Sequence, residues 1–189
     1  MNMSQLVVPV NDRDHVAGSV EAPVVLVEYG DFECPHCGRA YPIVEAARRY
    51  LSDELCFVYR HFPLAEVHPH ATLAAEASEA AGTQGKFWDM HHMLFEHQNA
   101  LDEPYLLVYA DELHLDVTRF ATELAEGVHT RKVRDDFRGG VRSGVNGTPT
   151  FFINGARFDG NWADPGAFIA VLAQVAAYVH GSEPIGSDR

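Results

Sequence analysis

The sequence has only three cysteines in 189 residues, at positions 34, 37 and 56. Secreted domains that are held together by disulfides are shorter and much richer in cysteine, so a disulfide framework is excluded. The sequence also lacks a run of the ~20 apolar residues that a membrane-spanning helix needs. Its longest uncharged apolar run, 167–179, is too short and is interpreted as an amphipathic helix.

Basic residues are scarce as well. The chain has 14 Lys and Arg against 27 Asp and Glu, which gives a formal net charge of −13. This charge disfavours binding to nucleic acid and to anionic membrane surfaces. Residues 1–16 have neither the basic start nor the apolar centre of a secretory signal. We therefore expect a cytoplasmic protein with no membrane insertion and no nucleic-acid partner.

What the sequence does contain is a pair of cysteines at the junction of two predicted elements. Cys34-Pro35-His36-Cys37 follows an apolar, β-branched run at 23–29 and precedes a segment with helical apolar spacing. A thiol at the start of a helix lies among unpaired N–H groups that favour its thiolate. The spacing therefore predicts a dithiol redox site.

The remaining pattern gives a full order of elements. We predict strands at 24–29, 55–60, 150–153 and 156–158, and helices at 35–51, 69–81, 85–97, 104–114, 117–126, 130–142 and 165–179. The first strand, helix and next strand form a unit that predicts parallel strand pairing. The fold class is therefore α/β, in the order β-α-β, helical insertion, β-β-α. The polar tail from 181 to 189 is predicted to be disordered.

This order, with a dithiol at the start of the first helix, resembles the thioredoxin fold. Its details resemble the DsbA-like thiol–disulfide oxidoreductases: the Pro35-His36 pair, the helical pattern at 85–95, and the Gly-Thr-Pro-Thr sequence within 143–152. The resemblance implies a single domain over 1–189. It implies a thioredoxin-like core at 18–62 and 143–180, with a helical insertion at about 63–142.

The residue types assign the chemistry within the pair. Cys34, the more exposed thiol, is expected to be the nucleophile that forms a mixed disulfide with the substrate, and Cys37 to be the buried resolving thiol. His36 could stabilise the Cys34 thiolate by charge or by a hydrogen bond. In the family, the Pro35-His36 pair is associated with an oxidising disulfide.

Two further places are expected to complete the site. The resemblance implies a cis peptide bond before Pro149, which leaves the backbone at Thr148 open to a substrate strand. The hydroxyl of Thr148 could reach a thiolate, and family members that differ here differ in redox behaviour. Thr148 therefore leaves the choice between oxidase, isomerase and reductase open.

Glu28 lies six residues before Cys34, where the family has a buried acid beneath the dithiol. It could relay protons to Cys37, with Arg60 as its basic partner; the alternative is a structural ion pair. Cys56 lies in a strand-like run and is interpreted as a small apolar residue.

The sequence thus predicts an enzyme, a monomeric oxidoreductase with no cofactor beyond its own cysteines and no metal. Its partners would be protein or peptide thiols and disulfides, with an unidentified recycling partner or glutathione. A cytoplasmic isomerase or thioredoxin-like reductase is the chemical alternative, because the Pro-His pair suggests an oxidant while the cytoplasm is reducing. A zinc-binding or peptide-binding module without turnover is the other class. Its zinc ligands would come from the cysteines and His68 with His70, or His91 with His92.

Overall fold

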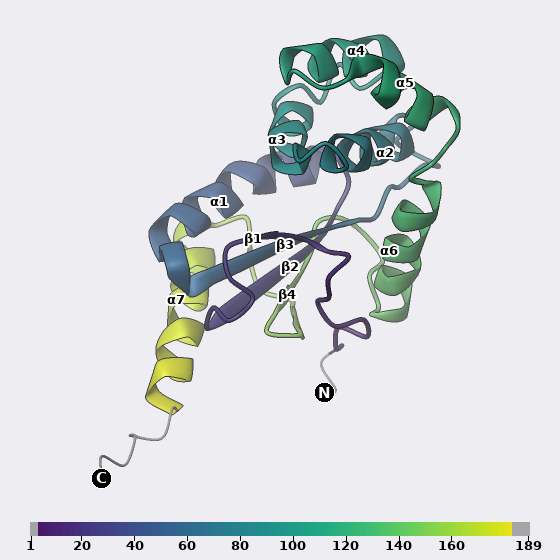
Figure 1. Ribbon diagram of the computed structural model, residues 1–189. Helices are drawn as coiled ribbons and strands as arrows, with labels where there is room; N and C mark the ends of the chain where they lie inside the picture. Colours follow the sequence, from purple (N-terminus) through teal and green to yellow (C-terminus); the bar gives the residue numbers. More distant parts are fainter. Residues whose placement is uncertain (1–3, 183–189) are drawn as a thin grey trace.

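A five-stranded sheet in the order β1-β3-β2-β4-β5 forms the centre of the computed structural model, which describes residues 4–182 (Figure 1). The strands are β1 (His15–Ala17), β2 (Val24–Gly30), β3 (Leu55–His61), β4 (Thr150–Ile153) and β5 (Ala156–Phe158). β2 pairs with β3 in parallel, as the sequence predicted, and the other pairings are antiparallel. The apolar run that predicted β2 fits its central position, since a strand with neighbours on both sides is buried on both faces.

The helices surround this sheet in three groups (Figure 1). Their bounds are α1 (Pro35–Leu51), α2 (Ala71–Gly82), α3 (Phe87–Glu96), α4 (Glu103–Glu112), α5 (Val117–Ala125), α6 (Thr130–Arg142) and α7 (Pro165–Ser182). α1 and α7 pack together over one face, α2 to α5 form a stack at one end, and α6 runs along the other side of β3. Gly140 permits the close approach of α6, because a Cβ there would collide with the rings of Phe62 and Tyr29.

The two faces of the sheet have separate cores because side chains alternate along a strand. Val24 and Leu26 belong to the larger core, shared with α1 and α7, whereas Val27 and Tyr29 belong to a smaller core that Phe137 of α6 covers. Glu28 lies two residues after Leu26 in β2, so its side chain points to the same face of the sheet. A single carboxyl group is thereby placed under α1, the helix that carries the cysteines.

The sequence located the main elements to within a few residues but missed β1. This strand has only three half-buried residues, too few for a periodic pattern, and it lies before the predicted start of the core at 18. The last helix also runs beyond its predicted end at 179, through Ser182, so the predicted disorder at 181 and 182 is wrong. The rest of the predicted tail, 183–189, lies outside the described residues. Within residues 4–182, no helix is both long and apolar enough to cross a membrane.

His91 is a buried polar group in the middle of α3. The ring centroids of Tyr59, Phe95, Trp88 and Phe32 lie 4.8, 5.0, 5.1 and 5.6 Å from its own. Neither ring nitrogen has a hydrogen-bond partner in the described part of the chain. Burial, together with nearby positive charge, holds the pKa of His91 well below its usual 6.5, so the ring is neutral in the folded protein.

The buried imidazole of His91 should make the free energy of unfolding depend on pH. Below about pH 6.5 the unfolded chain gains a proton at His91 that the folded chain does not, so the free energy of unfolding should fall as the pH decreases. His91→Leu should make this fall shallower between about pH 7 and about pH 5 in urea titrations. An unchanged pH dependence in H91L would contradict this account.

Candidate active site

The two cysteines lie at the start of α1, directly after the loop that leaves β2. Cys34 is the residue before the helix and Pro35 is its first residue, so the sequence places both as predicted. Pro is suited to that position because its missing N–H would have no partner in the first turn. The amide of Gly38 donates to the carbonyl of Cys34 at 3.1 Å and closes the first helical turn.

Two side chains that the sequence did not single out hold this loop. The buried carboxylate of Asp31 accepts hydrogen bonds from the amides of Glu33 and Leu64, at 2.8 and 2.9 Å, and from Nδ1 of His68 at 2.7 Å. Gln98 donates to the carbonyls of Phe32 and Cys34, at 2.8 and 3.0 Å. Its approach requires Gly38, because a Cβ at that position would meet the Gln98 side chain. No spacing pattern announces such long-range contacts in a sequence.

Both thiols are buried, which differs from the expectation for Cys34. Cys34 is 3% exposed and Cys37 is 0% exposed. The predicted order holds, but the difference in exposure is small, because the loops around the helix start cover both residues.

The two thiols differ sharply in acidity. A hydrogen bond from Cys37, helped by Thr148 and by the amides of Cys37 and His36, outweighs burial and lowers the pKa of Cys34 to about 5. Burial, the hydrogen bond to Cys34 and the negative charges of Glu28 and Cys34 raise the pKa of Cys37 well above 9. At neutral pH the pair therefore consists of one thiolate and one thiol. This is the state that a nucleophile and a protected resolving group require.

His36 acts on Cys34 through its backbone. Nη2 of Arg39 lies 2.7 Å from Nδ1 of His36, and because a guanidinium can only donate, this nitrogen is an acceptor. The amide of His36 is among the groups that lower the pKa of Cys34.

Thr148 and Pro149 lie beside Cys34, where the resemblance placed them. Their peptide bond is cis. Sγ of Cys34 lies 3.5 Å from the carbonyl oxygen of Thr148, to which the thiol can donate. The buried hydroxyl of Thr148 has no other partner in the described structure, so it is free to donate to the thiolate and contributes to the lowered pKa.

Glu28 lies under the dithiol, also as expected. Burial, and secondarily the charge of Cys34, raises its pKa to about 8, and Oε1 has no hydrogen-bond partner in residues 4–182. Its neighbour in the register of β3 is Tyr59, whose pKa burial raises well above 10 with further contributions from Cys37 and Glu28. Tyr59 was missed, although aligning the two predicted parallel strands would have placed it opposite Glu28.

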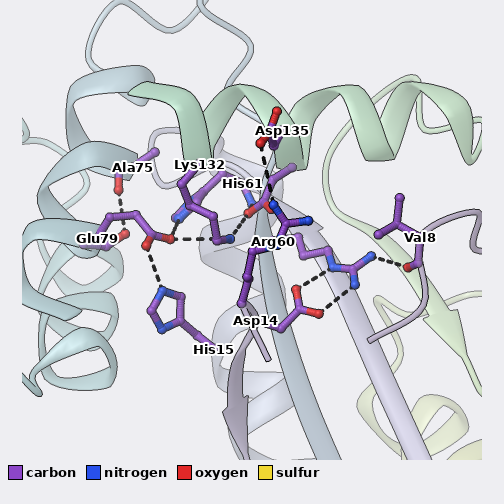
Figure 2. Close-up of polar contacts among 12 residues, drawn as sticks. Val8, Asp14, His15, Arg60, His61, Ala75, Glu79, Lys132 and Asp135 are labelled. Carbon is purple, nitrogen blue, oxygen red and sulfur yellow. Dashed lines mark hydrogen bonds and ion pairs between the residues drawn. The ribbon is translucent and has the colours of Figure 1, made fainter. Parts of the chain in front are cut away.

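The expectation that Arg60 partners Glu28 is wrong. Arg60 follows Tyr59 along β3, so its side chain points to the opposite face of the sheet. There its five N–H donors bind both carboxylate oxygens of Asp14, the hydroxyl of Tyr29 and the carbonyls of Val8 and Pro9, at 2.7–3.0 Å (Figure 2). The alternative interpretation, a structural ion pair between Glu28 and Arg60, is wrong for the same reason, because the ion pair of Arg60 is made with Asp14.

Cys56 lies on that same opposite face, in the smaller core. Burial raises the pKa of its thiol, which therefore stays protonated. Its position agrees with the interpretation as a small apolar residue, separated from the dithiol by the sheet.

Three of the four histidines considered as zinc ligands have other partners; His92 lies 2.9 Å from the hydroxyl of Tyr41, whereas His91 is enclosed by aromatic rings. His68 binds Asp31, and Nδ1 of His70 lies 3.0 Å from Glu33. In the described residues a different group, His61, Glu79 and Asp136, brings possible metal-ligand atoms within 4.8 Å of one another. Lys132 already contributes a cation there, with Nζ 2.6 Å from Asp136 and 3.7 Å from Glu79 (Figure 2).

Comparison with known proteins agrees with this geometry. A family model described as Thioredoxin matches residues 10–169. Among solved structures, BdbD from Bacillus subtilis superposes with a TM-score of 0.79 at 23% identity, covering 93% of this chain and 97% of BdbD. Alpha-DsbA1 from Wolbachia pipientis superposes at 0.82 with 18% identity, covering 95% and 98%. This chain belongs to the thioredoxin family and has a DsbA-like fold.

Other relatives of this DsbA-like chain have different names. A thioredoxin-like oxidoreductase from Silicibacter pomeroyi has a TM-score of 0.74 and 26% identity, covering 87% of this chain and 94% of its own. A protein named Na⁺/H⁺ antiporter NhaA 1 from Salinispora arenicola is 52% identical over 160 residues, which is 83% of this chain but 24% of that protein. The chain therefore spans about a quarter of the length of the curated relatives that it matches.

The hydrogen bond between the cysteines can be tested directly. Because Cys37 makes the largest contribution to the lowered pKa of Cys34, Cys37→Ala should raise that pKa toward 9. A rise of about two pH units would cut the thiolate fraction at about pH 6 roughly tenfold. The rate of alkylation by iodoacetamide as a function of pH measures this, with Cys56→Ala as the control. An unchanged midpoint in C37A would assign the acidity to the helix start instead.

Proposed function

We propose that this chain is a thiol–disulfide oxidoreductase that exchanges disulfides with cysteines of protein or peptide substrates through Cys34 and Cys37. The observation that carries the proposal is the opposite acidity of two thiols one helical turn apart, one a thiolate and the other a thiol at neutral pH. The family and the fold support this assignment. The antiporter name does not carry over, because the chain spans about a quarter of the proteins that bear it.

In the oxidising direction a substrate thiolate attacks Sγ of Cys34 in the Cys34–Cys37 disulfide. The bond between the two cysteines breaks, a mixed disulfide forms, and Cys37 leaves with the electron pair. A second substrate thiolate then attacks the substrate sulfur of the mixed disulfide and releases Cys34 as a thiolate. The substrate loses two electrons to the dithiol, and reduction of a substrate disulfide is the same sequence reversed.

Glu28 solves a proton problem in this sequence. Cys37 has a pKa well above 9, so it must gain a proton when it leaves, and it lies beyond the reach of water. The carboxyl group of Glu28, with a pKa of about 8, is protonated at neutral pH and can supply it. In reverse, the carboxylate of Glu28 would take the proton from Cys37 before it attacks.

Thr148 and Pro149 supply the substrate side of the site in this proposal. The backbone at Thr148 lies next to Sγ of Cys34, where an extended substrate chain could pair with it as an added strand. No cofactor is needed, because the electrons move between sulfur atoms. The dithiol would be returned to its working state by a recycling partner or by glutathione.

Glu28→Gln should slow both directions of exchange. We expect an inflection near pH 8 in the rate of mixed-disulfide resolution, from the titration of Glu28, and its loss in the variant with a decrease of about tenfold or more near neutral pH. Stopped-flow reduction by a cysteine-containing peptide measures this. Glu45→Gln, which removes a carboxyl group from the outer side of α1, should change neither. A pH profile unaltered in E28Q would remove Glu28 from the mechanism.

The direction of physiological exchange depends on the reduction potential. The pKa of Cys34, about 5, lies between about 7 in thioredoxin and about 3.5 in DsbA. Stabilising the thiolate favours the dithiol form, so the potential should fall between about −270 and about −120 mV.

Equilibration in graded glutathione buffers, with Cys56→Ala to avoid side reactions, measures this potential. A value near the upper limit would indicate a disulfide donor, and one near the lower limit a reductase. The absence of a reversible couple would overturn the proposed function and favour the module without turnover.

A further inference from the structure

The acidic chain carries a concentrated stripe of positive charge on α6. Arg131, Arg134, Arg138 and Arg142 are all exposed. At 3.6 residues per turn they fall within an arc of about 80° and extend over about 17 Å of the helix. Four of the 14 basic residues of a chain with a net charge of −13 therefore lie along one edge of one helix. We call this row the arginine stripe.

Charges inside the protein do not neutralise the arginine stripe. Arg131 forms one long ion pair, with Asp135 at 3.8 Å. Because the side chain of Arg131 is 93% exposed, water screens this pair. Within residues 4–182, the other three arginines have no ion pair. By contrast, Lys132 on the neighbouring side of α6 points inward to Glu79 and Asp136 (Figure 2). On α6, Lys132 thus neutralises carboxylates inside the protein, whereas the arginine stripe points to the outside with one weak ion pair, that of Arg131.

Hollows lie on both sides of the stripe. A cleft of about 690 Å³ between α6 and the segment around Val8 to Asp14 is lined by Arg138 and Arg142. A smaller hollow of about 300 Å³ on the other side is lined by Arg134 and again by Arg138. Arg60 also borders the larger cleft but is saturated by its own partners. The larger cleft is also lined by Arg13 and Lys132 and by the carboxylates of Asp14, Asp135 and Asp136, and these five side chains form ion pairs with partners inside the protein. Arg138 and Arg142 are therefore the lining cations without an ion pair in the described residues.

From this geometry we propose that the arginine stripe is a docking surface for an acidic polypeptide segment of a partner protein. Carboxylates match guanidinium groups in charge and in hydrogen-bond geometry. The flanking hollows accommodate side chains of a bound segment. About five extended residues reach along the stripe. This inference does not depend on the exchange chemistry of the cysteines.

Two other anionic partners fit the surface less well. Insertion into a membrane surface needs an apolar side next to the charges, but Val133 and Phe137 of α6 face the core, and Val141, 53% exposed, is a single small side chain. A nucleic acid longer than the stripe would extend over the rest of a chain whose net charge is −13, which disfavours it. A short acidic segment of about five extended residues matches the length of the arginine stripe.

The test uses the full chain and a fluorescein-labelled, glutamate-rich peptide of about eight residues, long enough to cover the stripe. Fluorescence anisotropy should detect binding that weakens as the salt concentration rises from about 50 to about 200 mM. The double reversal Arg134→Glu with Arg138→Glu should weaken binding about tenfold or more. Reversal of Arg49 in α1 and Lys86, the residue before α3, changes the net charge equally away from α6 and should leave affinity within about twofold. The alkylation rate of Cys34 should stay the same in both variants, which confirms that they fold.

Three results would overturn the proposal. The first is the absence of salt-sensitive peptide binding, and the second is equal weakening by both double reversals. The third is stronger arginine-dependent binding to vesicles containing phosphatidylserine or to a single-stranded oligonucleotide of similar length. That result would replace the polypeptide partner with a membrane or a nucleic acid.

Discussion

The alternation of side chains along β2 is the constraint on which the site depends. β2 lies in the middle of the sheet, so each of its side chains must enter one of two cores. One choice of phase puts Glu28 beneath α1 and Tyr29 beneath α6. A shift of one residue would exchange them and leave the dithiol without a carboxyl group below it. The apolar residues on either side of Glu28 fix this phase, because their burial far outweighs the cost of one protonated acid.

Burial then makes the groups around the dithiol compete for a single negative charge. Cys34, Cys37, Glu28 and Tyr59 are close enough for each to influence the acidity of another. The charge resides on Cys34, which accepts a hydrogen bond from the thiol of Cys37 and is further stabilised by Thr148 and by the amides of Cys37 and His36. The other three groups are held protonated. When Cys34 enters a disulfide, that charge disappears and the pKa of Glu28 loses one of its two causes. Electron transfer at sulfur and proton affinity at Glu28 are therefore linked.

Local patterns in the sequence were enough to predict the order of elements and the central residues of the site. The dithiol, its place at the helix start, the loop with Pro149 and the parallel pairing of the first two long strands all follow from spacing or from the family resemblance. The residues that were missed or misassigned depend on contacts between distant segments. The family resemblance placed a basic partner of Glu28 at Arg60, at the end of the neighbouring strand, yet the phase of β3 turns Arg60 toward Asp14. Gln98 and Asp31 support the loop through bonds that span 33 to 66 positions in the chain.

The position of each charge in the fold, like the contacts of Arg60, cannot be obtained from the sequence total. A net charge of −13 describes the average surface, but most interactions are screened beyond about 10 Å, so a partner senses only the charges close to it. Arg60 and Lys132 show that some cations serve to neutralise buried carboxylates and present little charge to the outside. The exposed arginines of α6 do the reverse, and they stand out because the surrounding chain is acidic. The net charge therefore disfavours nucleic acid and anionic membranes for the chain as a whole, but it does not describe the local charge along α6.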